Sequence, residues 1–124
     1  MKVTIAITLL ALFQYFFFGA LVARARGLSN VQAPATTGND VFERINRVHL
    51  NTMERLMLFV PLLWMASQTL TPMFVAGLGV LFLVGRLLYW RGYVQAPAKR
   101  KLGNILTMMS IAGLLVASIA GLFL

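Results

Sequence analysis

Long apolar segments are the feature that most constrains the fold of this chain. Four of them follow one another along 124 residues, with short polar connections between them, at residues 3–23, 41–70, 73–90 and 102–124. A helix needs about 20 apolar residues to cross the hydrocarbon core of a bilayer, so each segment is about long enough for one crossing. The sequence therefore predicts an all-α fold, with residues 1–124 forming a single integral membrane four-helix bundle.

The first segment also imitates a cleavable secretion signal, because Lys2 precedes it and small residues flank Arg24 at its end. A signal core is about 7 to 15 residues long, whereas this apolar run extends over residues 3–23. We therefore expect a retained first helix. The chain has no cysteine, so a sulfur nucleophile would have to come from a ligand.

Basic residues predict the orientation in the membrane. The chain carries 11 Lys or Arg against 3 Asp or Glu, a formal net charge of +8. The 69–72 connection is uncharged. Most of the basic residues lie near the first and third connections, namely Arg24, Arg26, Arg86, Arg91, Lys99, Arg100 and Lys101. The positive-inside rule then places these two connections in the cytoplasm and both termini on the opposite side. Topology and attraction to anionic lipids account for the charge, so we expect no nucleic-acid partner.

Polar side chains in the second segment share one face of the expected helix. At about 100° per residue, a face about 100° wide carries Arg44, Arg47, Asn51, Glu54 and Arg55. Ionisable residues at membrane depth are costly and usually face a bundle interior or a watery cavity. The start of the helix has an alternative explanation, in which it emerges into water and Glu43 pairs with Arg47. That alternative explains the three deeper residues less well.

A second polar face is expected at the same end of the third segment. Arg86, Tyr89 and Tyr93 follow one another at spacings of three and four residues, which places them on one helix face. Arg100 lies beyond an expected break at Pro97. The tyrosines also fit an aromatic belt at the membrane interface, and this alternative stays open.

Two polar faces at one level predict a pocket. Arginine forks bind carboxylates with two hydrogen bonds, and Glu54 could receive an amine. We therefore expect an anionic, amino-acid-like ligand that enters from the cytoplasmic side. His49 points away from the polar face and is as easily a contact with a neighbouring helix as a functional group. Without a second histidine or a carboxylate at ligand spacing, no metal site is expected.

The same residues carry a family resemblance. FERINRVHLNTME at residues 42–54, followed by Phe59-Val60-Pro61, resembles the signature of the membrane-associated proteins in eicosanoid and glutathione metabolism, the MAPEG family. The similarity extends back through residues 36–38 and forward through GRLLYWRGYVQAPAKRKLG at residues 85–103. The resemblance implies a homotrimer that holds glutathione, as cosubstrate, between adjacent subunits. It also implies a transferase or peroxidase whose glutathione thiolate attacks lipophilic electrophiles or lipid hydroperoxides from the membrane.

The resemblance also implies roles for single residues. The positions that match glutathione-binding residues are Arg26, Arg47, Asn51, Glu54, Tyr89 and Tyr93. The helix spacing adds Arg86 to this expected binding group. Arg100 matches an arginine beside the glutathione sulfur, where its charge would favour the nucleophilic thiolate, so it is the candidate catalytic residue. Two positions depart from the pattern of some members, since Arg55 stands in place of a tyrosine and Gly27 in place of an arginine.

Two other functions stay open. The family contains a lipid-binding member without enzymatic activity, so the same fold also suits a non-catalytic membrane lipid-binding or assembly protein. Such a protein would bind lipid without forming a glutathione thiolate. A small proton-coupled exporter also has four short helices, but it would need an acidic residue deep in a helix, where the first segment offers Gln14.

Overall fold

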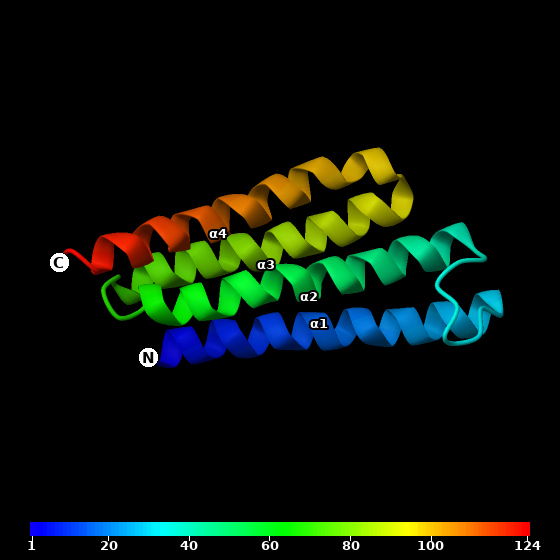
Figure 1. Cartoon of the computed structure of the whole chain (residues 1–124), viewed down its shortest axis with the longest axis horizontal. Coiled ribbons are helices and arrows are strands. Elements are labelled where there is room, and N and C mark those ends of the chain that lie inside the picture. Colours follow the sequence, from blue (N-terminus) through cyan, green and yellow to red (C-terminus); the bar gives the residue numbers. More distant parts are fainter.

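Four long helices form an antiparallel bundle in the computed structural model, which describes all 124 residues (Figure 1). They are α1 (Lys2–Ser29), α2 (Asp40–Ala66), α3 (Pro72–Gln95) and α4 (Lys101–Gly121), with a short 3-10 helix, η1 (Pro97–Arg100), before α4. Both termini lie at one end of the bundle, and the α1–α2 and α3–α4 connections lie at the other. The predicted all-α four-helix fold is confirmed.

The helices differ in their suitability for a membrane. α1, α3 and the segment formed by η1 and α4 are long and apolar enough to cross one. α2 is 27 residues long but carries six charged side chains, all between Asp40 and Arg55. The apolar remainder of α2 packs with the other three helices, so its charged half is the part that needs polar partners or water.

Helix ends depart slightly from the apolar segments. α1 continues to Ser29 and α3 to Gln95, because helical hydrogen bonding extends beyond the last apolar residue. Asp40 is the first residue of α2, and Asn39 caps the helix by accepting a hydrogen bond from the Phe42 amide at 3.0 Å. Asparagine is among the preferred residues at this position. Helix α3 starts at Pro72, and proline is favoured at the first helical position.

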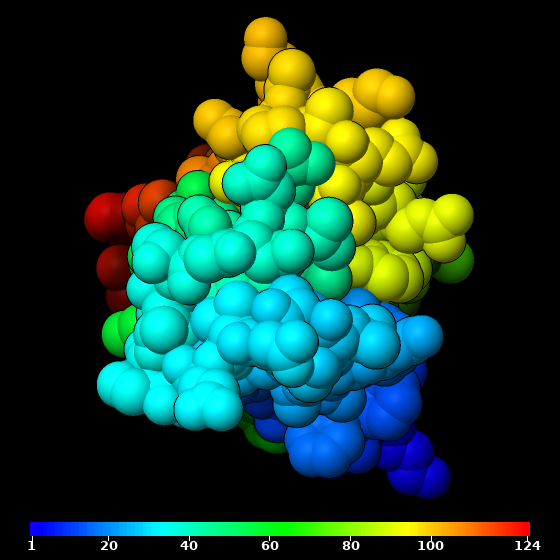
Figure 2. Space-filling model, turned by 90° about the vertical axis from the view of Figure 1, so that its right-hand side faces the viewer, coloured from blue at the N-terminus to red at the C-terminus, as the bar shows by residue number.

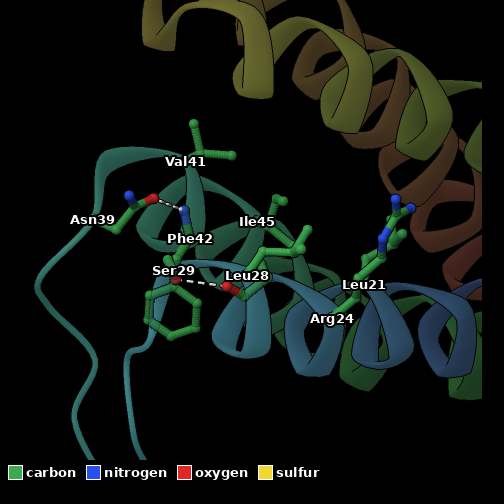
Figure 3. A pocket seen from close by; sticks show the side chains of 9 residues that line it. Leu21, Arg24, Leu28, Ser29, Asn39, Val41, Phe42 and Ile45 are labelled. Carbon is green, nitrogen blue, oxygen red and sulfur yellow. Dashed lines mark hydrogen bonds between the residues drawn. The ribbon is translucent and has the colours of Figure 1, made fainter.

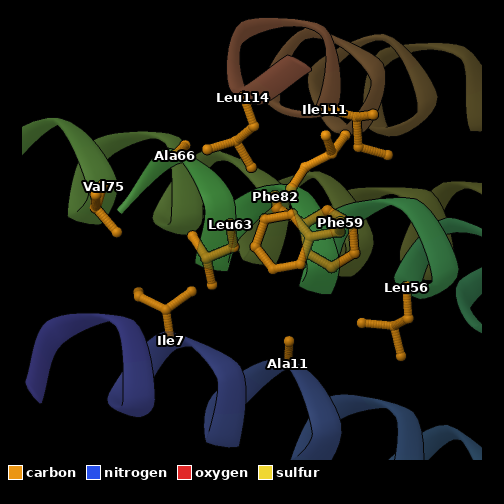
Figure 4. Packing of buried hydrophobic residues seen from close by; sticks show 11 residues of the cluster. Ile7, Ala11, Leu56, Phe59, Leu63, Ala66, Val75, Phe82, Ile111 and Leu114 are labelled. Carbon is orange, nitrogen blue, oxygen red and sulfur yellow. The ribbon is translucent and has the colours of Figure 1, made fainter. Parts of the chain in front are cut away.

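An apolar core fills the bundle from its middle towards the termini (Figure 4). Eleven buried side chains from all four helices form it, and at its centre the rings of Phe59 and Phe82 stack with centroids 3.8 Å apart. In a bilayer the hydrophobic effect does not drive helices together, so close packing supplies much of the stabilisation. The core leaves the connection end of the bundle to polar residues.

Glycines bring α3 and α4 into backbone contact. A Cβ atom on Gly103 would lie 2.1 Å from the Tyr89 nitrogen, and one on Gly85 would lie 2.8 Å from the Thr107 nitrogen. Small residues permit such approach between membrane helices. Elsewhere in α3, a Cβ atom on Gly79 would lie 2.6 Å from the Ile7 side chain of α1, whereas one on Gly77 would have no neighbour within 4 Å. The α3–α4 contact sets the distance between Tyr89 and the start of α4.

Candidate functional site

A polar hollow lies between α2, α3 and α4 near the connection end of the bundle, the end that faces the viewer in Figure 2. Its volume is about 240 Å³, and its lining residues are Arg47, Asn51, Arg55, Tyr89, Tyr93, Arg100 and Asn104. Five of these seven are residues that the sequence assigned to one site. The fold therefore brings Arg47 and Asn51 of α2 together with Tyr89, Tyr93 and Arg100.

Arg86 lies beneath the hollow rather than in its lining. Its side chain is fully buried, and it donates hydrogen bonds from Nη1 to Asn51 Oδ1 at 2.7 Å and from Nε to Thr107 Oγ1 at 3.1 Å. Its guanidinium carbon lies 4.4 Å from the centre of the Tyr89 ring. Within one chain, Arg86 thus reaches the hollow through Asn51 and Tyr89. Helix spacing placed Arg86 on the polar face but could not show how deeply it is buried, and its direct contact with a ligand stays a prediction.

Glu54 forms the one ion pair in the chain, with Arg47. Arg47 Nη2 and Glu54 Oε1 are 3.2 Å apart, and both side chains are about half exposed, at 47% and 50%. Exposed pairs of this kind contribute at most about 1 kcal/mol, so a ligand carboxylate can compete for Arg47. The pairing of Glu43 with Arg47, which the sequence offered as an alternative explanation of the helix start, does not form, because Glu43 Oε2 accepts a hydrogen bond from the Gly38 amide at 3.1 Å.

Arg26 lies apart from the hollow within one chain. Its Nη1 donates a hydrogen bond to the Ala35 carbonyl at 2.7 Å, and its guanidinium carbon lies 4.7 Å from the centre of the Phe42 ring. These contacts hold the α1–α2 connection against the helices. Phe42 also lines a second, mostly apolar hollow of about 350 Å³ between α1 and α2 (Figure 3). No residue assigned to the ligand site lines this second hollow.

His49 contacts α1. Its ring stacks on Tyr15, with centroids 4.4 Å apart and an interplanar angle of 14°, and it faces Gly19. Of the two explanations that the sequence left open, the structure shows a contact with a neighbouring helix.

Positive charge dominates the polar hollow. Arg47, Arg55 and Arg100 line it, Arg86 lies below, and Glu54 is the carboxylate next to it. The Arg100 guanidinium carbon lies 5.4 Å from the centre of the Tyr93 ring, which leaves its N–H groups available to a ligand. Coulomb attraction between unit charges 4 Å apart is worth about 4 kcal/mol near a protein surface. The site is therefore suited to a small anion with several hydrogen-bond acceptors.

Comparison with known proteins decides the family. The family model for MAPEG matches residues 4–120. This chain belongs to the MAPEG family. Membership agrees with the helical membrane bundle and supports a glutathione-related function in a membrane.

Relatives of this MAPEG chain include named enzymes. It is 37% identical to microsomal glutathione S-transferase 2 of Mus musculus over 124 residues, which cover 96% of the chain and 83% of the relative. It is 35% identical to leukotriene C4 synthase of Bos taurus over 95 residues, covering 77% and 63% respectively. An uncharacterised protein of Synechocystis is 43% identical over 115 residues, covering 90% and 84%.

Two residues of the hollow were not assigned to the ligand site from the sequence: Arg55, which was placed on the polar face of the second segment, and Asn104. Asn104 follows Arg100 by four residues and so lies on the same side of the chain, at the first turn of α4. The i, i+4 spacing from Arg100 was the available signal. This spacing did not point to the site, because Asn104 belongs to a segment whose composition is otherwise strongly apolar.

Proposed function

We propose that this protein is a membrane glutathione transferase or glutathione-dependent peroxidase. The observation that carries the proposal is the polar hollow, in which Arg47, Asn51, Tyr89, Tyr93 and Arg100 meet. Two guanidinium groups of the lining, those of Arg47 and Arg100, lie towards the connection end of the bundle, and the lining contains no carboxylate. Glutathione presents two carboxylates and a thiol, and arginine forks match carboxylates. A glutathione S-transferase among the relatives supports the same assignment.

The residues divide into binding and activating groups. Arg47, Asn51 and the two tyrosines would hold the peptide, Glu54 would accept its ammonium group, and Arg86 would support Asn51 from below. Arg100 would lie near the sulfur, because a nearby positive charge favours the thiolate. Glutathione supplies the nucleophile, and the second substrate is a lipophilic molecule that reaches the site from the bilayer.

We also propose a homotrimer. Arg26 does not reach the other predicted glutathione-binding residues of its own chain, because it lies over Phe42 on the α1–α2 side. In a trimer, Arg26 of a neighbouring subunit could complete the site. The detergent-solubilised complex, after subtraction of bound detergent, should have about three times the 13.7 kDa subunit mass. A stable monomer that still binds glutathione would contradict a site shared between subunits.

The proposed orientation places the α1–α2 and α3–α4 connections in the cytoplasm, because they carry the basic residues. The chain has no cysteine, so single cysteines report position cleanly. In intact cells, an impermeant maleimide should label Gln68→Cys, in the α2–α3 connection, and should label Lys99→Cys only after the membrane is opened. The reverse pattern would invert the topology.

An ultraviolet difference titration with glutathione at neutral pH tests the proposed function. Purified protein in detergent should give a saturable thiolate absorbance and should conjugate glutathione to an electrophile or reduce a hydroperoxide. The absence of both the thiolate absorbance and a heat of binding would contradict the proposal. That result, with retained binding of membrane lipid, would favour the non-catalytic lipid-binding or assembly protein.

A further inference from the structure

Arg55 is the one arginine at the polar hollow that makes neither an ion pair, nor a hydrogen bond, nor a contact with an aromatic ring in the protein. Arg47 pairs with Glu54, Arg86 lies over Tyr89, and Arg100 lies over Tyr93. Arg55 makes no such contact, and its Nε atom, like Nη2 of the otherwise hydrogen-bonded Arg86, is buried without an acceptor. A buried donor without a partner costs about 1–3 kcal/mol, and more when it is charged. The position therefore favours a ligand that brings an acceptor.

The position of Arg55 along α2 indicates which ligand this is. Arg47, Asn51 and Arg55 succeed one another at intervals of four residues and all line the hollow. At 1.5 Å per residue, Arg55 lies about 12 Å deeper than Arg47 along the helix. A peptide that enters from the water meets Arg47 first, whereas a molecule that enters from the bilayer meets Arg55 first.

An apolar groove lies farther along α2 and α4, beyond the deep side of the hollow. It lies between α2 and α4, has a volume of about 440 Å³ and is lined almost entirely by apolar side chains. Leu58 of the groove follows Arg55 by three residues, and Met108 follows Asn104 by four. These spacings keep groove and hollow on the same helix faces. Arg55 therefore lies between the polar hollow and the apolar groove along α2.

We propose that Arg55 selects lipophilic second substrates whose reacting end gains negative charge on oxygen, in particular alkyl hydroperoxides, with the apolar tail in the α2–α4 groove. The assignment rests on the proposed glutathione-dependent function and makes Arg55 a specificity-determining residue. The positive charge of Arg55 complements an oxyanion, and a preorganised donor aimed at a developing oxyanion is worth about 10²–10³ in rate.

The reaction balances as follows. The glutathione thiolate attacks the terminal oxygen of the hydroperoxide, the S–O bond forms, the O–O bond breaks, and the electron pair passes to the alkoxide. Arg55 donates hydrogen bonds to the alkoxide but keeps its own proton, because a guanidinium does not deprotonate in proteins. Water protonates the alkoxide. The sulfenic acid of glutathione then reacts with a second glutathione to give the disulfide and water.

The test compares two second substrates in unaltered protein, Arg55→Gln and Arg55→Lys. Tetradecyl hydroperoxide carries no carboxylate, so its only oxygens are those that react; benzyl chloride carries no oxygen. We expect Arg55→Gln to lower kcat/KM for the hydroperoxide about 100-fold, as for a lost oxyanion donor, and for benzyl chloride less than about threefold. Arg55→Lys keeps the charge but loses the fork, so its kcat/KM for the hydroperoxide should lie between those of the unaltered protein and Arg55→Gln. The glutathione Kd should stay within about threefold throughout.

Arg91→Gln is the matched control, because Arg91 is an exposed arginine of α3 that lines none of the hollows described above. It should leave both activities unchanged. Equal losses for the two substrates, an unaltered hydroperoxide activity in Arg55→Gln, or a weakened glutathione Kd would each overturn the role of Arg55. Absence of glutathione binding in the unaltered protein would instead overturn the proposed function, and the substrate assignment with it.

Discussion

Replacement of Arg100 by alanine should remove the thiolate absorbance of bound glutathione and lower turnover about 100-fold, while most of the glutathione affinity remains. Arg100 lines the polar hollow at the α3–α4 connection and has no carboxylate partner. An opposite charge within about 4–6 Å shifts a pKa by about 1–3 units towards the charged form. Without Arg100 the thiol pKa rises, and the thiolate fraction at neutral pH falls accordingly.

The pH dependence separates this role from a structural one. Because the variant raises the thiol pKa, its thiolate fraction and turnover should recover as the pH is increased, whereas a misfolded site would not recover. Lys101→Ala removes the neighbouring positive charge, which lies outside the lining of the hollow, and serves as the control. Full thiolate absorbance in Arg100→Ala at neutral pH would remove Arg100 from the activating role.

Glu54→Ala should show the opposite division of effects. Glu54 orients Arg47 across 3.2 Å and accepts a weak hydrogen bond from Asn51 at 3.5 Å. Its loss should weaken glutathione binding about tenfold, about 1.4 kcal/mol, with the thiolate still formed at saturation. Calorimetric Kd values beside the thiolate titration measure both quantities. Equal loss of binding in Arg100→Ala and Glu54→Ala would contradict the division of roles.

Replacement of Gly103 by alanine should destabilise the bundle and disrupt the site at once. The added Cβ would lie 2.1 Å from the nitrogen and 2.5 Å from the Cα of Tyr89. Both neighbours are backbone atoms, so α3 and α4 would have to separate. Overpacking of this kind typically costs about 1–3 kcal/mol. The same shift displaces Tyr89 relative to Arg100, so the thiolate absorbance should fall with the melting temperature.

Gly77→Ala is the matched control for this prediction. Gly77 also lies in α3, but a Cβ atom there has no neighbour within 4 Å. Alanine is favoured over glycine in a helix interior by about 0.5–1 kcal/mol, so this variant should unfold at the same or a higher temperature. Thermal unfolding in detergent, followed by circular dichroism, measures both variants. An unchanged melting temperature for Gly103→Ala would contradict the backbone contact.

Much of the candidate site could be predicted because it follows from local rules. A helix repeats every 3.6 residues, so spacing alone places Arg47 beside Asn51 and Tyr89 beside Tyr93. The family resemblance added Arg100, and the structure brings all five into one hollow. Their roles towards glutathione remain predictions.

Other features could not be predicted, because they depend on how the helices are rotated and how closely they approach. Spacing placed Arg86 on the polar face, but the proximity of Thr107 on α4 buries it. Glu43 and Glu54 are both within reach of Arg47 along α2. Glu43 accepts a hydrogen bond from the Gly38 amide instead, and Arg47 pairs with Glu54.

The sequence by itself determined the four helices, the all-α membrane fold, the family and the polar faces, since apolar length and helical period are properties of single segments. Only the tertiary structure decided that Arg86 lies beneath the hollow, that Arg26 lies apart from it, and that Arg55 remains without a partner beside an apolar groove. These outcomes depend on contacts between helices, and the closest contact depends on a glycine whose missing Cβ lets two backbones meet.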